Sequence, residues 1–546
     1  MLSNERMTKI ALVGTKDLMK DTIEVLHSLK IIHIIDFKEQ DETFQIGKPL
    51  GEVSKFSEIL LSIRSILSTF DIRPENLKKT YSKREVTREL ETEVLKTEKE
   101  IKVLNEKITK LTSVLGQINN LKSIGDLENL GLEKNVLNSF DNILSSKSNL
   151  EAQRKKLKDQ LDFLIKEKSS YFLQYEDFLS AEIDKMEAPL RFTTTTNTFL
   201  IEGWISEKKY KPLEETIKKR FGNRVHLEKV KFSDEESVPV EFKHPAPVKP
   251  FELLLDLFEY PKNREIDPTF ALFITFPLFY GIMLGDIGYG LVIFISTILL
   301  KMKLKTEGWK MLLGILEYSS VYTIAFGFID GEFFGFDIFN LLGIEEILGL
   351  RMPIIDRIVD FMPVLIMSIS IGVFHVLLGL VLGFINVKKA HGLKEAILEK
   401  GSWIILVVSL IVIATSNYIS YLFMYVGAGL LLLSIILLVI GEGFIGLIEI
   451  FGIMSNVLSY VRLMAIGLSS VGVAIVINSI VMDIILPKGG IFVPLGYLVL
   501  VVGHIGNIML GILASFLHSL RLHYVEFFTK FYEGGGIKFK PFGIKY

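Results

Sequence analysis

The sequence SNVLSYVRLMAIGL, which spans Ser455–Leu468, places one arginine inside an apolar segment that continues to about Leu486. An arginine at bilayer depth costs about 2.5–3.5 kcal/mol even on the lowest insertion scales, so its default interpretation is functional. The polar residues of this region have spacings of four, three and seven and share one helix face: Ser455, Ser459, Arg462 and Ser469. The alternative is an arginine that extends from a helix end to the membrane surface. The long apolar run after Arg462 favours the intramembrane position.

Polar residues also recur every three or four positions in the last long apolar segment: His504, Asn507, Gly511, Ser515, His518 and Arg521. This spacing gives an otherwise apolar helix one polar face. Two such helices, each with an arginine, indicate a buried aqueous or ionic path. The alternative is that the polar face joins helices, since small and polar residues also stabilise contacts between membrane helices.

The composition divides the chain into two parts. It has 546 residues, no cysteine, 49% hydrophobic residues and a formal net charge of −2. Most charges precede residue 265 and most long apolar runs follow it, which predicts a soluble part at 1–250 and a membrane part at 251–546. The lack of cysteine excludes disulfides and thiolate metal sites, and no cofactor motif is present. The near-neutral charge gives no reason to expect nucleic acid.

The soluble part has two predicted α/β units, at roughly 1–80 and 185–235, in which β-branched runs flank a helical pattern. Between them, residues 84–180 carry two heptad seams separated by a glycine-containing segment. We therefore expect a dumbbell, in which an antiparallel coiled-coil hairpin joins two globular units. A proline-rich linker, Val238–Pro250, leads into the membrane part.

The membrane part has eight predicted spans, at about 268–284, 286–302, 309–329, 361–386, 401–420, 424–441, 452–486 and 491–526. The last two would each be roughly 50 Å long against a hydrocarbon core of about 30 Å, so they must tilt or protrude. The expected fold is an α-helical polytopic membrane domain, its last two helices long and tilted, preceded by an N-terminal cytoplasmic α/β dumbbell with a coiled-coil hairpin.

The distribution of lysine predicts the orientation. Lysines are concentrated after spans two, four and eight, whereas the loop after span three is acidic. With an even number of spans, the positive-inside rule puts these basic segments on the same side as the N-terminal part. Met1–Lys9 is polar and the apolar run that follows is too short for a signal peptide, which predicts a cytoplasmic N-terminal part. We expect a multi-pass protein of the cell membrane with a cytoplasmic N-terminal domain and C-terminus, in contact with lipid.

Two further carboxylates of the membrane part, Glu449 and Asp286, could be functional or structural. Glu449 precedes Arg462 by thirteen residues, and is either a station for a proton or ion or an interfacial carboxylate at a helix start. Asp286 lies in the sequence GDIGYG, where turn chemistry explains it best.

The other ionisable residues of the membrane part also have two interpretations. Glu317 and His375 lie within spans, where a satisfied interhelical hydrogen bond is favoured over a direct functional role. Asp330 and Glu332 either line an outer vestibule or end a helix.

Four motifs resemble those of the a subunit, also called subunit I, of archaeal- and vacuolar-type rotary ATPases. They are Pro250–Glu252 with Glu265–Thr269, Gly281–Gly290, Ser455–Leu463, and Leu517–Glu526 with Phe531–Gly534. The resemblance covers essentially the whole chain and includes the order of a soluble part before eight spans. At the position where eukaryotic relatives carry an acid, ten residues before the second arginine, this chain has Gly511.

The resemblance implies a stator subunit that provides ion half-channels beside a rotating proteolipid ring. Arg462 would be the essential arginine that faces the ring's carboxylate, and Arg521 the second arginine. The soluble part would bind the coiled-coil subunits of the peripheral stalk, with the central-stalk rotor subunits nearby. The subunit would couple translocation of H⁺ or Na⁺ to ATP hydrolysis or synthesis without being an enzyme, because the ATPase sites lie on other chains.

The chemistry of arginine agrees with such a role. Guanidinium does not deprotonate in proteins, and it favours the ionised form of a nearby carboxylate. A fixed charge at Arg462 would displace the ion from each ring carboxylate and block a direct leak. The candidate ion-translocation residues are Arg462, Arg521, Glu449, Ser459, Ser455, His504, Asn507, Ser515 and His518.

Three other protein classes fit less well. A secondary ion transporter with a coiled-coil cytoplasmic domain is the main alternative, although no pair of matching interrupted halves is evident. A membrane enzyme would need a nucleophile, a metal cluster or a phosphate loop. A signalling receptor would leave two intramembrane arginines unexplained.

Overall fold

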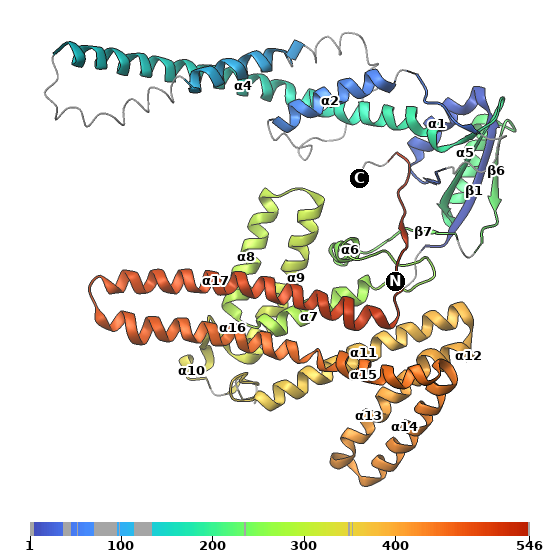
Figure 1. Cartoon of the computed structure of the whole chain (residues 1–546), viewed down its shortest axis with the longest axis vertical. Helices are drawn as coiled ribbons and strands as arrows, with labels where there is room; N and C mark the ends of the chain where they lie inside the picture. Colours follow the sequence, from blue (N-terminus) through green and yellow to red (C-terminus); the bar gives the residue numbers. More distant parts are fainter. Residues whose placement is uncertain are drawn as a thin grey trace. The chain divides into compact units, whose positions relative to one another are not determined.

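The computed structural model describes residues 5–36, 45–51, 53–69, 96–97, 99–113, 134–233, 236–344, 346–347, 350–351 and 353–543. The chain divides into two compact units, shown in Figure 1. One contains Thr8–Lys231 with Lys540–Tyr546 and is called the sheet unit here. The other contains Met1–Met7 with Phe232–Phe539 and is called the helical unit. The boundary after Lys231 precedes the predicted one at residue 250.

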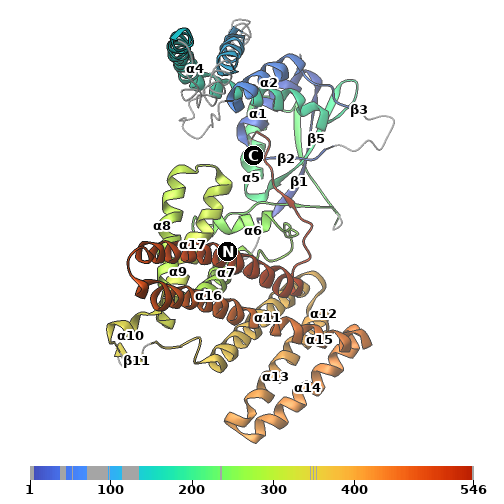
Figure 2. The same ribbon diagram turned by 60° about the vertical axis from the view of Figure 1, so that its left-hand side comes forward.

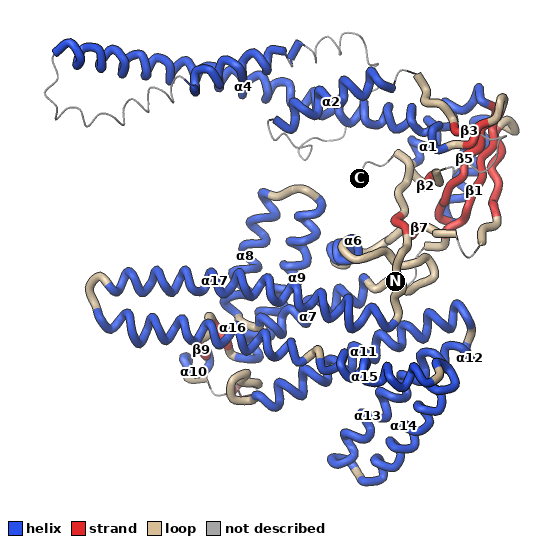
Figure 3. The backbone as a smooth tube through the Cα atoms, in the orientation of Figure 1, coloured by secondary structure: helices blue, strands red, loops and turns tan. Residues whose placement is uncertain are grey.

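The sheet unit is built on one six-stranded sheet, drawn in red in Figure 3. The order is β3-β4-β5-β1-β6, with β2 also paired to β5. The strands are β1 (Met7–Thr15), β2 (His33–Ile34), β3 (Gln45–Ile46), β4 (Thr193–Thr194), β5 (Thr198–Ser206) and β6 (Val225–Val230). β1 and β6 are antiparallel, with Leu12 opposite Leu227.

The two predicted α/β units form one domain, so the expectation of two separate globes is wrong. Helices α1 (Met19–Leu29) and α5 (Glu207–Phe221) come from different predicted units, yet Leu26 and Leu213 are fully buried in the same core. The physical reason is backbone pairing. Each strand needs a partner for its N–H and C=O groups, and strands from either side of the hairpin supply these partners to each other.

The coiled coil is partly described. Helix α4 (Lys134–Glu187) is 54 residues long and returns to the sheet. Ile101 packs with Leu161 of α4, as the predicted seams require. Helix α2 (Val53–Thr69), which the sequence assigned to the first globe, also packs along α4. Residues 70–95 and 114–133, which hold the ends of the first seam and the predicted turn, lie outside the described residues.

The helical unit contains, among the described residues, six helices that are long and apolar enough to cross a membrane. Their cores are α9 (Glu307–Asp330), α11 (Phe361–His391), α13 (Ser402–Ile419), α14 (Tyr421–Glu442), α15 (Phe444–Leu458) with α16 (Val461–Ser479), and α17 (Phe492–Arg521). Two shorter apolar helices, α7 (Thr269–Leu284) and α8 (Ile287–Lys303), have 16 and 17 residues.

Short elements connect these helices. They are α6 (Glu252–Asp256), α10 (Ile338–Leu342), α12 (Leu393–Ala396), β7 (Pro239–Val240), β8 (Glu332–Phe333), β9 (Phe336–Asp337), β10 (Glu346–Ile347), β11 (Leu350–Arg351) and β12 (Ile537–Lys538). Single turns of π-helix extend α16 to Ile485 and α17 to Phe527.

The last two helices lie at a steep angle to two helical hairpins of the same unit. α16 and α17 run side by side, across the directions of the α8–α9 and α13–α14 hairpins (Figures 1 and 2). The predicted seventh span, 452–486, differs from the structure, because the helix begins at Phe444 and is interrupted between Leu458 and Val461.

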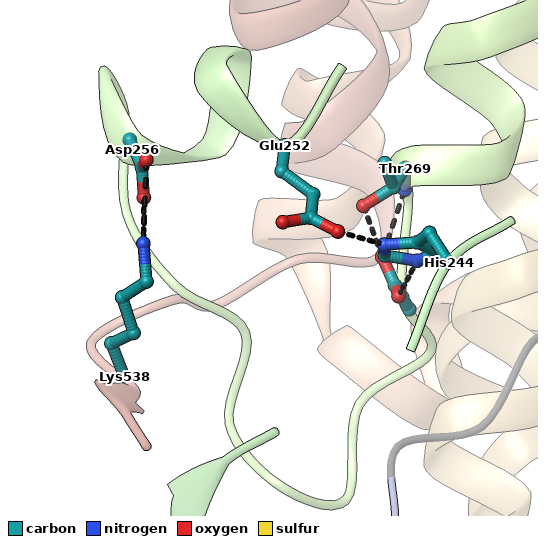
Figure 4. A network of polar contacts seen from close by, with 6 residues as sticks. His244, Glu252, Asp256, Thr269 and Lys538 are labelled. Carbon is teal, nitrogen blue, oxygen red and sulfur yellow. Dashed lines mark hydrogen bonds and ion pairs between the residues drawn. The ribbon is translucent and has the colours of Figure 1, made fainter. Parts of the chain in front are cut away.

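The segment before α7 is held by a buried histidine, shown in Figure 4. His244 Nδ1 lies 2.7 Å from Glu252 Oε1, and its Nε2 lies 2.7 Å from Asp267 Oδ2. The other oxygen of Asp267 accepts hydrogen bonds from the amide and hydroxyl of Thr269, the first residue of α7. Burial lowers the pKa of His244, but the hydrogen bonds to Asp267 and Glu252 outweigh it and raise the pKa to about 9.

The doubly paired His244 predicts a pH-dependent stability. A folded-state pKa of about 9 lies above the usual 6.5, so the stabilisation is fully present below about pH 6.5 and is lost as the pH rises through 9. This stabilisation amounts to at most about 3 kcal/mol, since one pKa unit corresponds to 1.36 kcal/mol.

Thermal unfolding of the purified protein between pH 6 and 10 measures this pH-dependent stabilisation. We expect His244→Gln to lower the Tm at pH 6 and to flatten the alkaline decrease, whereas His226→Gln, at an exposed strand position, leaves both unchanged. Parallel curves for the wild type and His244→Gln would contradict this assignment.

Candidate functional site

Arg462 lies directly after the interruption between α15 and α16. The turn is tight, because the Tyr460 amide donates to Val457 O at 3.1 Å and the Leu463 amide donates to Tyr460 O at 2.9 Å. Tyr460 is fully buried, and its hydroxyl lies 2.5 Å from His375 Nδ1 of α11. α11 therefore fixes the turn that positions Arg462, and His375 makes the interhelical hydrogen bond expected of it.

The two arginines share their surroundings with two other ionisable residues. Arg462 is half-buried, and its Nη1 is buried without a hydrogen-bond partner among the described residues. Arg521, at the end of α17, is exposed. His518 and Glu526 each lie within electrostatic range of both arginines. Ser459 lies beside Glu526, and these five residues are called the arginine cluster.

Glu526 was not among the predicted site residues. It is 1% exposed, and its Oε2 has no hydrogen-bond partner among the described residues. The sequence carried one signal, since Glu526 follows Arg521 by five residues within the quoted motif. The π-helical turn Leu522–Phe527 sets its position there, and periodicity does not reveal such a turn.

His504 and Asn507 belong to a separate hydrogen-bonded network. Asn507 Nδ2 donates to the Tyr289 hydroxyl at 2.9 Å, and that hydroxyl lies 2.8 Å from His504 Nδ1. His504 Nε2 lies 3.0 Å from Asn478 Oδ1, and Asn478 Nδ2 donates to Phe334 O at 2.8 Å. This chain joins α8, α16 and α17 and is called the tyrosine network. The contacts match the alternative given for the polar face, in which these residues join helices.

The network ends near Asp286, the N-cap of α8. Its carboxylate accepts hydrogen bonds from the amides of Tyr289, at 2.9 Å, and Gly335, at 3.0 Å. This is the turn chemistry expected for Asp286.

The middle of the α17 polar face is closely packed. Ser515 is fully buried and its hydroxyl has no hydrogen-bond partner among the described residues. At Gly511 a Cβ atom would lie 2.4 Å from Leu284 Cδ1. A side chain at residue 511 would therefore require the Leu284 side chain of α7 to move.

The predicted residues of α15 lie on its exposed surface. Ser455 is exposed, and its carbonyl accepts hydrogen bonds from the amide and the hydroxyl of Ser459, both at 3.0 Å. Glu449 is exposed, and it interacts electrostatically with Lys530. The interruption at Ser459 and Tyr460 separates Glu449 from the helix that carries Arg462.

A second buried charged group joins Asp330 and Glu332 with one residue that sequence reasoning missed, Arg357. Arg357 forms an ion pair with Asp330 at the end of α9, and both side chains are 6% exposed. A Cβ atom at Gly467 would lie 3.0 Å from Arg357 Nη1, so the guanidinium fits closely against α16. Glu332 interacts electrostatically with Arg357 and Asp330, and its Oε2 is buried without a hydrogen-bond partner among the described residues. Arg357 was detectable as a basic residue within the acidic loop after the third predicted span.

A cavity of about 120 Å³ adjoins this group. Asp330 and Arg357 line it together with apolar residues of α9, α11 and α16. Leu463 and Met464, which directly follow Arg462, are part of its wall.

Glu317 of α9 forms an ion pair with Lys301 of α8. This pair agrees with the interpretation of Glu317 as an interhelical contact.

Comparisons with known proteins identify the family. A sequence profile of the V-type ATPase 116kDa subunit family matches residues 185–328 and 440–544. The A-type ATP synthase subunit I of Archaeoglobus fulgidus is 33% identical over 100% of this chain and 99% of its own length. The protein of the same name from Halobacterium salinarum is 24% identical over the same shares of both chains. That from Pyrococcus horikoshii is 36% identical over 68% of this chain and 58% of its own.

The similarity to the Archaeoglobus protein extends over both units, and the profile match includes both arginines and Glu526. This chain therefore belongs to the subunit I family of A-type ATP synthases and V-type ATPases.

Proposed function

We propose that this chain is the membrane stator subunit of a rotary ATPase and that its helical unit forms two ion half-channels beside a proteolipid ring. The observation that carries the proposal is the arginine cluster, in which the half-buried Arg462 and the exposed Arg521 lie on two packed helices that are otherwise largely apolar. A charge in apolar surroundings costs free energy unless an opposite charge pairs with it. A carboxylate on another chain would provide such a partner in addition to Glu526.

The mechanism follows from the permanent charge of Arg462. The guanidinium lowers the pKa of a ring carboxylate that comes within a few ångströms, because the opposite charge favours its ionised form. The carboxylate then releases its proton or Na⁺, and reloads after it has moved past the arginine. Because guanidinium keeps its proton, the arginine also stops ions from passing directly between the half-channels.

The polar groups near Arg462 fall into two sets, and we assign one set to each half-channel. Glu526, His518 and Ser459 would line the half-channel at one end of the bundle. Asp330 and Glu332, with the cavity that reaches Leu463, would line the other. The tyrosine network would be a hydrogen-bonded wall between helices and not a conducting path, because its groups are already paired.

The same proposal assigns the topology and the partners. α7 and α8 would cross the membrane together with the six longer helices, giving eight spans with the sheet unit and the C-terminus in the cytoplasm. The sheet unit with its coiled coil would bind the peripheral-stalk subunits, close to the central rotor. ATP would be hydrolysed or made on other chains.

Transport by the whole complex in vesicles tests the function. Uptake of ²²Na⁺ driven by ATP and resistant to a protonophore would identify a sodium path, whereas acidification without Na⁺ would identify protons. Ion transport along a gradient that neither requires ATP nor makes it from ADP and phosphate would favour the secondary transporter and contradict the proposal.

We expect Arg462→Lys to assemble but to lose ATP-driven ion uptake by about tenfold or more, because a buried lysine can deprotonate and lacks the planar fork of donors. Uptake per assembled complex is the measurement. Arg220→Lys, at an exposed position of α5, is the matched control and retains normal uptake. Normal uptake by Arg462→Lys would exclude the displacement mechanism.

We expect Glu526→Gln to lower uptake by about tenfold or more, since it removes a carboxylate in range of both arginines that can take up a proton or bind a cation. Glu449→Gln is the matched comparison, and we expect uptake within about twofold of normal, since its carboxylate is exposed on α15, away from the helix that carries Arg462. The opposite ranking would move the half-channel from Glu526 to Glu449.

A further inference from the structure

Helix α11 presents one histidine between two glycines to the elements that carry the arginine cluster. Gly372, His375 and Gly379 follow one another at spacings of three and four, so they share one face of α11. All three are buried. α11 packs against α15, against α16 and against the π-helical turn Leu522–Phe527. The face made by these three residues is called the α11 cradle.

One end of the cradle holds the turn that precedes Arg462. A Cβ atom at Gly372 would lie 2.7 Å from Cδ2 of Tyr460, so the tyrosine ring lies directly against the backbone of α11. The hydroxyl of this tyrosine lies 2.5 Å from His375 Nδ1. Its carbonyl accepts the amide of Leu463, one residue after Arg462, at 2.9 Å. The place of the Tyr460 ring therefore determines where the first turn of α16 lies.

The other end of the cradle holds the turn that carries Glu526. Phe527 directly follows Glu526 and is fully buried. Its ring stacks on that of His375, with 4.0 Å between centroids and 14° between planes. A Cβ atom at Gly379 would lie 3.1 Å from Phe527 Cδ2, so this ring too approaches the α11 backbone closely. The same imidazole thus contacts both turns.

Neighbouring rings fix the imidazole of His375 in place. It meets the ring of Phe279 in α7 edge to face, with 4.9 Å between centroids, and the ring of His523 at 5.0 Å. His523 Nε2 lies 2.7 Å from Thr275 Oγ1, which joins this group to α7 a second time. Side chains packed in this way keep one rotamer, so His375 is a fixed reference for the two turns.

We propose that His375 is a positioning residue that sets the spacing between Arg462 and Glu526 by holding both turns on α11. The inference rests on the proposed function. His375 acts through Tyr460 and Phe527, and it is not itself a station for the ion.

The spacing matters because attraction between opposite charges grows as their separation falls. A carboxylate too close to Arg462 would neutralise the charge that acts on the ring. One held farther away would leave Arg462 without its polar neighbour inside the chain.

The first test measures ATP-driven ion uptake per assembled complex in vesicles. Tyr460→Phe removes only the hydroxyl that His375 contacts, and His375→Ala removes both contacts of the imidazole. His375→Asn is the conservative variant, since its amide places a hydrogen-bonding atom near the position of Nδ1. Tyr280→Phe is the matched control, because Tyr280 is also fully buried in the helical unit and its hydroxyl has no hydrogen-bond partner among the described residues.

We expect Tyr460→Phe and His375→Ala to lower uptake about tenfold, because misplacing a functional group by about 1 Å can lower a rate up to about 100-fold. His375→Asn should recover most of the uptake that His375→Ala loses. Tyr280→Phe should stay within about twofold of the wild type, since removing an unpaired hydroxyl breaks no hydrogen bond. Normal uptake by both Tyr460→Phe and His375→Ala would overturn the positioning role.

The second test measures the spacing itself in the full chain, in lipid nanodiscs, by electron paramagnetic resonance. The chain has no cysteine, so spin labels attach only to introduced ones. Ala465→Cys on α16 with Val525→Cys in the π-helical turn reports the spacing, and both positions are exposed. Leu410→Cys on α13 with Leu433→Cys on α14, also exposed, is the reference pair.

Tyr460→Phe and His375→Ala should shift or broaden the distance distribution of the first pair and leave the reference pair unchanged. His375→Asn should restore the wild-type distribution. An unchanged first pair would overturn the inference even where uptake falls. A change of both pairs would also contradict it, because His375 would then stabilise the whole bundle and not this spacing.

The two tests separate this inference from the proposed function. The distances are measured without transport, so they show whether His375 holds the two turns whatever the complex does. The proposed function fails separately, if the wild type shows no ATP-driven transport or if Arg462→Lys transports normally.

Discussion

A permanent positive charge among apolar helices is the constraint on which the arrangement of the helical unit depends. A guanidinium keeps its charge in proteins, and hydrocarbon cannot solvate a charge. The side of α16 that carries Arg462 therefore needs a polar neighbour. Within the chain this neighbour is Glu526, and in the proposed function a ring carboxylate would be a second one.

The turn before Arg462 shows how distant parts of the chain meet this constraint. An uninterrupted helix from residue 444 would continue its rotation through residue 462, and the turn at Tyr460 changes where the guanidinium points. The hydroxyl of Tyr460 is held by His375, which lies 85 residues earlier in the sequence. The periodicity of a local segment carries no information about a contact between residues so far apart in the sequence. For this reason residues 452–486 were predicted as one continuous helix.

The sequence was most informative where one physical effect dominates. The apolar helices follow from hydropathy, because a buried backbone must satisfy its own hydrogen bonds. The functional interpretation of Arg462 rests on the rarity of charge in such a run and stays a prediction. It was less informative where several contacts compete. The pairing of β1 with β6 across the coiled coil merges two predicted globes into one domain, and Arg357 is buried only because Gly285 and Gly467 leave space for its guanidinium.

Hydrogen-bond saturation separates the polar residues into two classes that the sequence could not distinguish. His504 and Asn507 share the α17 polar face with Ser515 and His518. Yet both ring nitrogens of His504 have partners in Tyr289 and Asn478, and the amide nitrogen of Asn507 donates to Tyr289 and Ser470. A group engaged in this way must break a bond before it can accept an ion, and a broken bond in an apolar surrounding is expensive. Groups with unsatisfied oxygen atoms, such as Glu526 and Glu332, carry no such penalty and gain from a proton, a cation or water. In the proposed function, the ion path would therefore follow the unsatisfied groups, and the satisfied ones would hold the helices around it together.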